Sequence, residues 1–260
     1  MLQTQVSLGP MTINTYTLTI ALGALIGGLW ALWPARRSWQ ELSRAVNGLL
    51  LVALGGLALG RTGYVLLNGD YFREHMDEVL SLASPGYCEQ AAIIGGLAGW
   101  AISRRLRQAI TAPALVVLAT LIGIGASLGC VSHGCAYGRE VFWTDGWLWQ
   151  LRADWPDAYT INNPRLPTQL FMLAWLVACL AITRWRGRAG GMRIAGLWLV
   201  LFAVGDFSIE FLRIDATPIL GSLRAGQWAD IVLMVTGILA LILRMRPLYV
   251  KPGQVNSWLW

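Results

Sequence analysis

Long apolar stretches separated by short polar connections fill the chain from about residue 13 to about residue 246. A hydrocarbon core about 30 Å thick is crossed by roughly 17 to 25 helical residues. Such stretches cross as helices, because backbone polar groups must be satisfied inside the bilayer. The pattern predicts an all-α polytopic integral membrane protein with about seven transmembrane helices. The expected spans lie near residues 13–34, 46–68, 88–103, 113–130, 168–183, 194–212 and 228–246.

Charged residues are few, and the basic ones gather at alternate connections. The chain is 56% hydrophobic and 13% charged, whereas soluble domains carry about 25% charged residues. Because basic connections tend to stay in the cytoplasm, we expect the N-terminus outside and the C-terminus in the cytoplasm. We expect a single membrane domain over residues 1–260. The basic clusters lie at residues 36–44, 104–107, 184–193 and 244–251.

The net charge of +6 raises the question of a nucleic-acid partner. Nucleic-acid-binding surfaces are basic patches or stripes clustered on one face. Here the only lysine is Lys251, and no basic run is interleaved with aromatic residues. The charge therefore indicates topology, and we expect no nucleic-acid partner.

Several ionisable residues fall inside the expected spans. Such residues are costly in a bilayer and are functional candidates that face the protein interior. Asp206 and Glu210 share a helix face at i and i+4, and Arg213 follows within reach of Glu210. A buried ion-pair network that fixes helix packing is one interpretation. We favour a polar cavity open to the outer leaflet, because guanidinium groups bind phosphate in a bidentate fashion. The ionisable residues are Arg61, Glu89, Asp206, Glu210, Arg213 and Asp230.

Six segments, in this order, resemble the motifs of the prolipoprotein diacylglyceryl transferase family. The resemblance covers about residues 15–246 and matches the family's seven-span, N-outside topology. It implies transfer of a diacylglyceryl group from phosphatidylglycerol to the lipobox cysteine of a prolipoprotein, at the outer face of the bacterial cytoplasmic (inner) membrane. The expected partners are thus an anionic phospholipid and a prolipoprotein signal peptide, with no cofactor. The segments are GRTGYVLLNGDYF (60–72), GYCEQAAIIGG (86–96), GASLGCVSHGCAYGR (125–139), RLPTQLF (165–171), IEFLR (209–213) and GQWADI (226–231).

The resemblance also implies roles for individual residues. Gln90, Glu210 and Arg139 stand at positions expected to be catalytic. The lipid site is expected to use a set of polar residues and one glycine that the family pattern retains. These are Arg61, Gly138, Arg139, Gln169 and Arg213.

Other family positions are replaced in this chain. The signature Gly-Arg-x-Gly-Asn-Phe-x-Asn-Gly-Glu-x-x-Gly-Arg places its first arginine on Ser127, and the family's histidine falls on Gln90. A further arginine position is occupied by Asp206. Glutamine cannot act as a general base near neutral pH, and loss of one preorganised donor typically costs about 10²–10³ in rate. The chain is therefore expected to be either a divergent transferase with an outer-leaflet phospholipid site, or a catalytically lapsed, lipid-binding accessory subunit of a membrane complex.

Cysteines occupy two further signature positions. Cys130 falls on an asparagine and Cys135 on the glutamate, with His133 between them. An outer location permits a disulfide, for which Cys88 is an alternative partner, and ordinary buried cysteines are a second interpretation. A thiol-dependent membrane enzyme using Cys130 and Cys135 is a third. Zinc needs about four ligands, and this stretch supplies three, so no metal site is predicted.

Overall fold

The computed structural model describes most of the chain as helices. The described residues are 5–8, 11–80, 86–108, 110–155, 161–186, 191–214 and 217–243. Long helices dominate them: α1 (Thr15–Leu32), α2 (Trp39–Leu67), α4 (Glu89–Arg105), α5 (Ala112–His133), α6 (Thr168–Trp185), α7 (Gly191–Glu210) and α8 (Ala225–Ile242).

Short elements join or precede these helices. Two-stranded antiparallel hairpins form at β1–β2 and β3–β4. The short elements are β1 (Gln5–Leu8), β2 (Met11–Asn14), η1 (Trp33–Arg37), α3 (Gly69–Glu74), η2 (Met76–Glu78), η3 (Trp143–Leu151), β3 (Ile219–Leu220) and β4 (Leu223–Arg224).

The prediction of an all-α polytopic membrane protein is confirmed. Among the described residues, six helices are long and apolar enough to cross a membrane: α1 with η1, α2, α5, α6, α7 and α8. The helix at 89–105 has 17 residues, at the short end of what crosses a bilayer. The number of seven spans and the orientation of the termini stay predictions, and the end of the last expected span, 244–246, lies outside the described residues.

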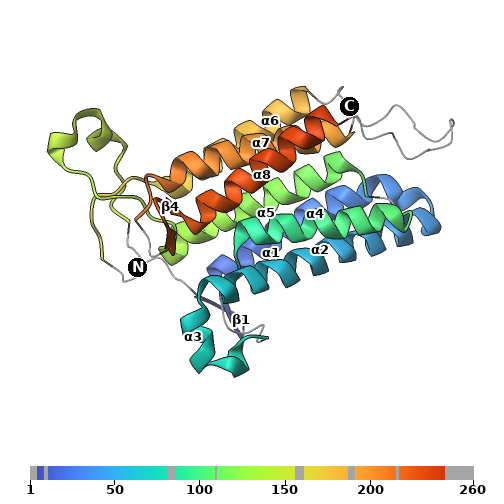
Figure 1. Cartoon of the computed structure of the whole chain (residues 1–260), viewed down its shortest axis with the longest axis horizontal. Coiled ribbons are helices and arrows are strands. Elements are labelled where there is room, and N and C mark those ends of the chain that lie inside the picture. The colour runs from blue at the N-terminus through green and yellow to red at the C-terminus, as the bar shows by residue number, and fades with distance from the viewer. Residues whose placement is uncertain are drawn as a thin grey trace.

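The long helices run side by side, and α5 is the central one (Figure 1). It packs against α1, α6 and α7, while α2 pairs with α4 and α7 with α8. Apolar side chains surround α5 on most sides, as expected for a helix buried within a bundle. The helix α8 also contacts α4, so that α4, α7 and α8 lie next to one another.

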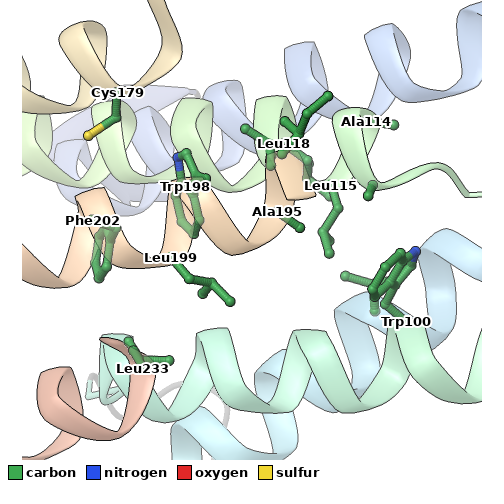
Figure 2. Close-up of a cluster of buried hydrophobic side chains, with 14 of the residues drawn as sticks. Trp100, Ala114, Leu115, Leu118, Cys179, Ala195, Trp198, Leu199, Phe202 and Leu233 are labelled. Carbon is green, nitrogen blue, oxygen red and sulfur yellow. The ribbon is translucent and has the colours of Figure 1, made fainter. Parts of the chain in front are cut away.

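The hydrophobic core lies where these helices converge (Figure 2). Trp198 of α7 stacks on Phe202 with ring centroids 5.2 Å apart, and its indole Nε1 donates to Thr120 Oγ1 of α5 at 2.9 Å. Leu233 of α8 and Cys179 of α6 are fully buried in the same cluster. A buried indole with its N–H satisfied fixes the register of α7 on α5.

Glycines bring α2 and α4 into close contact. A Cβ added at Gly95 would collide with the backbone of Gly55, and one at Gly99 would collide with the backbone at Leu51. Small residues let helix backbones approach in this way. The two adjacent glycines of α4, Gly95 and Gly96, differ in this respect. A Cβ at Gly96 would make only ordinary contacts, the nearest at 3.7 Å.

The non-helical connections collect at one end of the bundle. Figure 1 shows α3, β4 and the connection between α5 and α6 at the same end, with η1 at the opposite end. η1 carries the basic residues Arg36 and Arg37. By the positive-inside rule, the end with the connections is the predicted outer end.

Candidate functional site

Polar residues from three helices meet inside the bundle near its predicted outer end. The amide Nε2 of Gln90 on α4 donates to Asp206 Oδ2 on α7 at 2.8 Å, and both side chains are buried. Glu210 lies one turn further along α7 and is also buried. The first turn of α8 passes close by, because a Cβ at Gly226 would collide with the Glu210 carboxylate and lie 3.2 Å from Gln90 Nε2. Glycine at 226 is thus needed for this approach.

Asp230 of α8 is the most unusual member of the group. Its side chain is 0% exposed, and its carboxyl group interacts with that of Asp206 on α7. Its charged neighbours are Asp206, Glu210 and Glu89. Burying an ionised carboxylate among other acids is expensive unless a charge or a hydrogen-bond donor compensates it, so Asp230 is a functional candidate within its span.

Glu89, an exposed residue, adds a further acid near this group. It begins α4, and an added Cβ at Gly123 of α5 would lie 3.9 Å from Glu89 Oε1. Tyr16 of α1 is within electrostatic range of both Glu89 and Arg213. The acids and the phenol therefore belong to one electrostatic environment.

A pocket of about 190 Å³ opens beside Glu210. Arg213 Nη1 lies 3.8 Å from Glu210 Oε1. Arg224 Nη1 donates to Thr217 Oγ1 at 2.9 Å, and its Nη2 donates to the backbone carbonyl of Arg213 at 2.5 Å. Two guanidinium groups and a carboxylate therefore share this space with apolar side chains. The lining residues are Glu210, Phe211, Arg213, Ile219, Ser222, Leu223, Arg224 and Gln227.

The signature residues 138 and 139 form a short extended segment beside this pocket. Gly138 forms an antiparallel bridge with Arg213, and Arg139 N donates to Leu212 O at 2.7 Å. A Cβ at Gly138 would lie 2.9 Å from Leu166 Cβ, so glycine is required by close approach. The Arg139 guanidinium lies 3.8 Å from Asp145 of η3. This segment fixes the position of Arg213 through the backbone.

The cysteines of the signature stretch form a disulfide. Cys130 and Cys135 are joined across the end of α5, where Gly134 takes the left-handed conformation that closes many helices. Gln169, at the start of α6, donates from Nε2 to the Cys135 carbonyl at 2.8 Å. Bonded sulfurs are not thiolate nucleophiles. Among the described cysteines, Cys88 is free and half-buried, and its Sγ lies 3.6 Å from Gln90 Oε1.

Arg61, expected at the lipid site, holds the loop after α3. Its guanidinium donates to the carbonyls of Val79 at 3.0 Å, Gly86 at 3.0 Å and Glu78 at 2.5 Å. Tyr71 donates to the Glu78 carboxylate at 3.1 Å, and this hydrogen bond raises the pKa of the Tyr71 phenol. These contacts tie Arg61 to the residues that follow α3, and its expected role in lipid binding stays a prediction.

The structure brings together Gln90, Asp206, Glu210 and Arg213, and it places Gly138, Arg139 and Gln169 in the adjoining connections. Sequence reasoning missed Arg224 and Gln227 as site residues. Gln227 lies in the GQWADI segment, which was recognised as a motif, whereas Arg224 precedes it in a connection where a basic residue carries no signal. Among the described residues, no group of three or more His, Cys, Asp or Glu side chains is placed to hold a metal ion.

Comparison with known proteins places this site in a family. The family model described as prolipoprotein diacylglyceryl transferase matches residues 3–243. The chain is 27% identical over 249 residues to the phosphatidylglycerol–prolipoprotein diacylglyceryl transferase of Geobacillus kaustophilus, covering 91% of this chain and 90% of the relative. It is 28% identical over 252 residues to that of Synechococcus elongatus, covering 92% and 86%. It is 26% identical over 258 residues to the enzyme of the same name from Bacillus velezensis, covering 91% of this chain and 90% of the relative. This chain belongs to the prolipoprotein diacylglyceryl transferase family.

Proposed function

We propose that the chain transfers a diacylglyceryl group from a phospholipid of the phosphatidylglycerol type to the lipobox cysteine of a prolipoprotein. The reaction would take place at the outer face of the bacterial inner membrane, on one membrane domain that spans residues 1–260. The observation that carries the proposal is the pocket at the predicted outer end, where Arg213 lies 3.8 Å from buried Glu210. The names of the relatives supply the substrates.

The reaction requires a nucleophile, a base and a site for a leaving phosphate. The thiol sulfur of the prolipoprotein attacks the glycerol carbon that carries the phosphate. A carbon–sulfur bond forms, the carbon–oxygen bond to the phosphate breaks, and the headgroup leaves with the phosphate. Arg213 and Arg224 line the pocket and would stabilise the charge on that phosphate. Arg139 would add charge from the adjoining segment.

Glu210 is the carboxylate best placed to accept the thiol proton. It lines the pocket, and it is the only acidic residue among the pocket-lining residues in the described part of the chain. The proton would then pass to the leaving phosphate. Gln90, at the family's histidine position, would act as a positioning residue through its hydrogen bond to Asp206, because its amide does not accept a proton near neutral pH.

A second candidate function is lipid binding without transfer, as an accessory subunit of a membrane complex. The Gln90–Asp206 pair favours it, since a neutral amide and an acid replace a base and a cation of the family pattern. This role predicts that the chain co-purifies with other membrane subunits from native membranes and that the purified chain forms no product.

The test is reconstitution of the purified chain with phosphatidylglycerol and a lipobox peptide, with mass spectrometry of the peptide for a thioether-linked diacylglyceryl group. The transferase proposal expects product from the unmodified chain and a loss of about 10²-fold or more for Arg213→Ala. Arg73→Ala is the matched control, because Arg73 is exposed and paired only with exposed Asp70 in the described contacts.

A triple variant separates the two candidates. Gln90→His, Ser127→Arg and Asp206→Arg together restore the family residues at three positions. Product from this variant alone would support the lipid-binding role on an intact scaffold. Absence of product from both chains, under conditions in which a transferase from a relative is active, would contradict the transferase proposal.

A further inference from the structure

We propose that the chain binds the headgroup of an anionic glycerophospholipid where α1 and α6 end, at the end of the bundle opposite the pocket (Figure 1). The two sites share no residue, because the pocket beside Glu210 is lined by residues from 210 to 227. The inference therefore stands independently of the proposed function. Its ligand would come from the leaflet that this end of the bundle faces, which the positive-inside rule predicts to be the cytoplasmic one.

The charges at this end of the bundle are almost all positive. Among the described residues there, Glu41 in the first turn of α2 is the only acid. A surface with this surplus of positive charge attracts anionic lipid headgroups, and each arginine near the membrane surface adds to the attraction. The described arginines of this end are Arg36, Arg37, Arg44, Arg104, Arg105, Arg107, Arg184, Arg186 and Arg193.

Two tryptophan rings hold two of these arginines in place. Cζ of Arg36 lies 3.4 Å from the centroid of the Trp33 ring, and Cζ of Arg184 lies 5.5 Å from that of the Trp30 ring. Trp30 packs against the hydrophobic core, and Trp33 follows it by three residues, which makes the two positions neighbours on the helix surface. One guanidinium group from η1 and one from α6 are therefore presented on the same side of the end of α1.

Guanidinium groups stacked in this way keep the edges that bind phosphate. The planar group contacts the ring with its face, whereas its N–H groups lie in its plane and match the oxygens of a phosphate. Among the described residues, neither Arg36 nor Arg184 forms an ion pair, and both are exposed. A phosphate bound between them would supply the anionic partner, and Trp33, which is 61% exposed, suits the depth of the headgroups.

The experiment measures lipid retention by the full purified chain in native mass spectrometry. Phosphatidylglycerol and phosphatidylcholine with identical acyl chains are added in equal amounts, so that only the headgroup differs. We expect preferential retention of phosphatidylglycerol. The variant Arg36→Gln, Arg184→Gln should lower this preference by about fivefold for each arginine removed. The same loss is expected in chains that also carry Arg213→Ala, since that residue lines the pocket at the opposite end.

Two further variants separate a built site from diffuse attraction. Arg36→Lys, Arg184→Lys keeps both charges and loses the planar groups, so an intermediate preference is expected. Arg105→Gln removes an exposed arginine at the same end for which no ring contact is found among the described residues, and it should change the preference less than twofold. A loss in Arg105→Gln as large as that for each of the other two arginines would overturn the site. Thermal midpoints close to that of the unmodified chain show that the variants are folded.

Crosslinking locates the bound headgroup. Phosphatidylglycerol with a photoreactive group on its headgroup, added to the chain in nanodiscs, should label residues 30–37 and 184–186. Labelling confined to the pocket-lining residues would overturn the inference, whether or not thioether product forms in the transfer assay. Glycerol phosphate is the soluble competitor. Unchanged labelling in its presence supports a lipid site, whereas loss of labelling at millimolar competitor would assign the arginines to a free phosphate ester instead.

Discussion

At the residue scale, the arginines of the outer end differ in what their side chains contact: Arg213 lines the pocket, whereas Arg61 donates to backbone carbonyls. Arg61 was expected to bind a lipid phosphate, yet three of its hydrogen bonds go to loop carbonyls. Arg213 and Glu210 share the pocket. Sequence spacing does not reveal this difference, because Glu78, Val79 and Gly86 meet the Arg61 guanidinium only in the folded chain.

Arg61→Ala is expected to release that loop. The substitution removes a charged donor and leaves partly buried carbonyls without this partner, which typically costs about 1–3 kcal/mol. Hydrogen exchange measured by mass spectrometry should rise over residues 76–80 and 86–88. The matched control Arg73→Ala removes an arginine whose side chain is 82% exposed, and it should leave exchange unchanged. Equal protection in Arg61→Ala would contradict the role of these contacts in holding the loop.

At the element scale, the approach of helices depends on individual glycines. The backbones of α2 and α4 touch at Gly55, Gly95 and Gly99. The stretch IIGGLAGW is also compatible with an ordinary well-packed helix, and only the packed pair shows which glycines are needed. The connection after α5 depends instead on a disulfide and a left-handed glycine.

Two neighbouring glycines of α4 are expected to respond differently to the same change. Gly95→Ala should destabilise the protein by about 1–3 kcal/mol, because its Cβ overpacks the contact with α2. Gly96→Ala should be neutral or stabilising, since its Cβ has room and alanine favours helix by about 1 kcal/mol. Thermal unfolding in detergent measures both. Similar midpoints for the two variants would contradict the close contact at Gly95.

Loss of the disulfide is expected to destabilise the turn after α5. A double Cys130→Ser, Cys135→Ser variant should lose about 2 kcal/mol, because the closed loop is short. Reducing agent should lower the unfolding midpoint of the unmodified chain and leave that of the double variant unchanged. Thioether product from the double variant would show that these sulfurs are not nucleophiles, whereas complete loss of activity with an unaltered midpoint would favour the thiol-dependent alternative.

At the scale of the whole molecule, the site and the connections that border it lie at one end of the bundle, opposite η1 (Figure 1). The basic residues of η1 predict that the site faces outward. Such a location would give the pocket access to the outer leaflet and to exported polypeptides.

Fusions to the C-terminus test this orientation. A fluorescent protein that folds only in the cytoplasm should be bright after residue 260, and an alkaline phosphatase that is active only outside should be inactive there. Fusion of the phosphatase after Asn68, which caps the end of α2, should be active. The reverse result would place the pocket in the cytoplasm and exclude the proposed reaction with exported prolipoproteins.

The sequence by itself determined the helical membrane architecture. In the hydrocarbon core, a long apolar stretch must satisfy its own backbone hydrogen bonds, and a helix does so within one segment. The i, i+4 spacing of Asp206 and Glu210 also placed them on one face, and the ordered motifs indicated the family. These features depend on local spacing or on segment order, both of which are visible in one dimension.

Only the tertiary structure decided which charges meet. Gln90 reaches Asp206 across 116 positions of the sequence, Arg224 joins the pocket through the β3–β4 hairpin, and Arg61 turns to the loop. Asp230 meets Asp206 because α8 packs against α7. Electrostatic interactions depend on distance and burial, and for residues far apart in sequence both are set by helix packing.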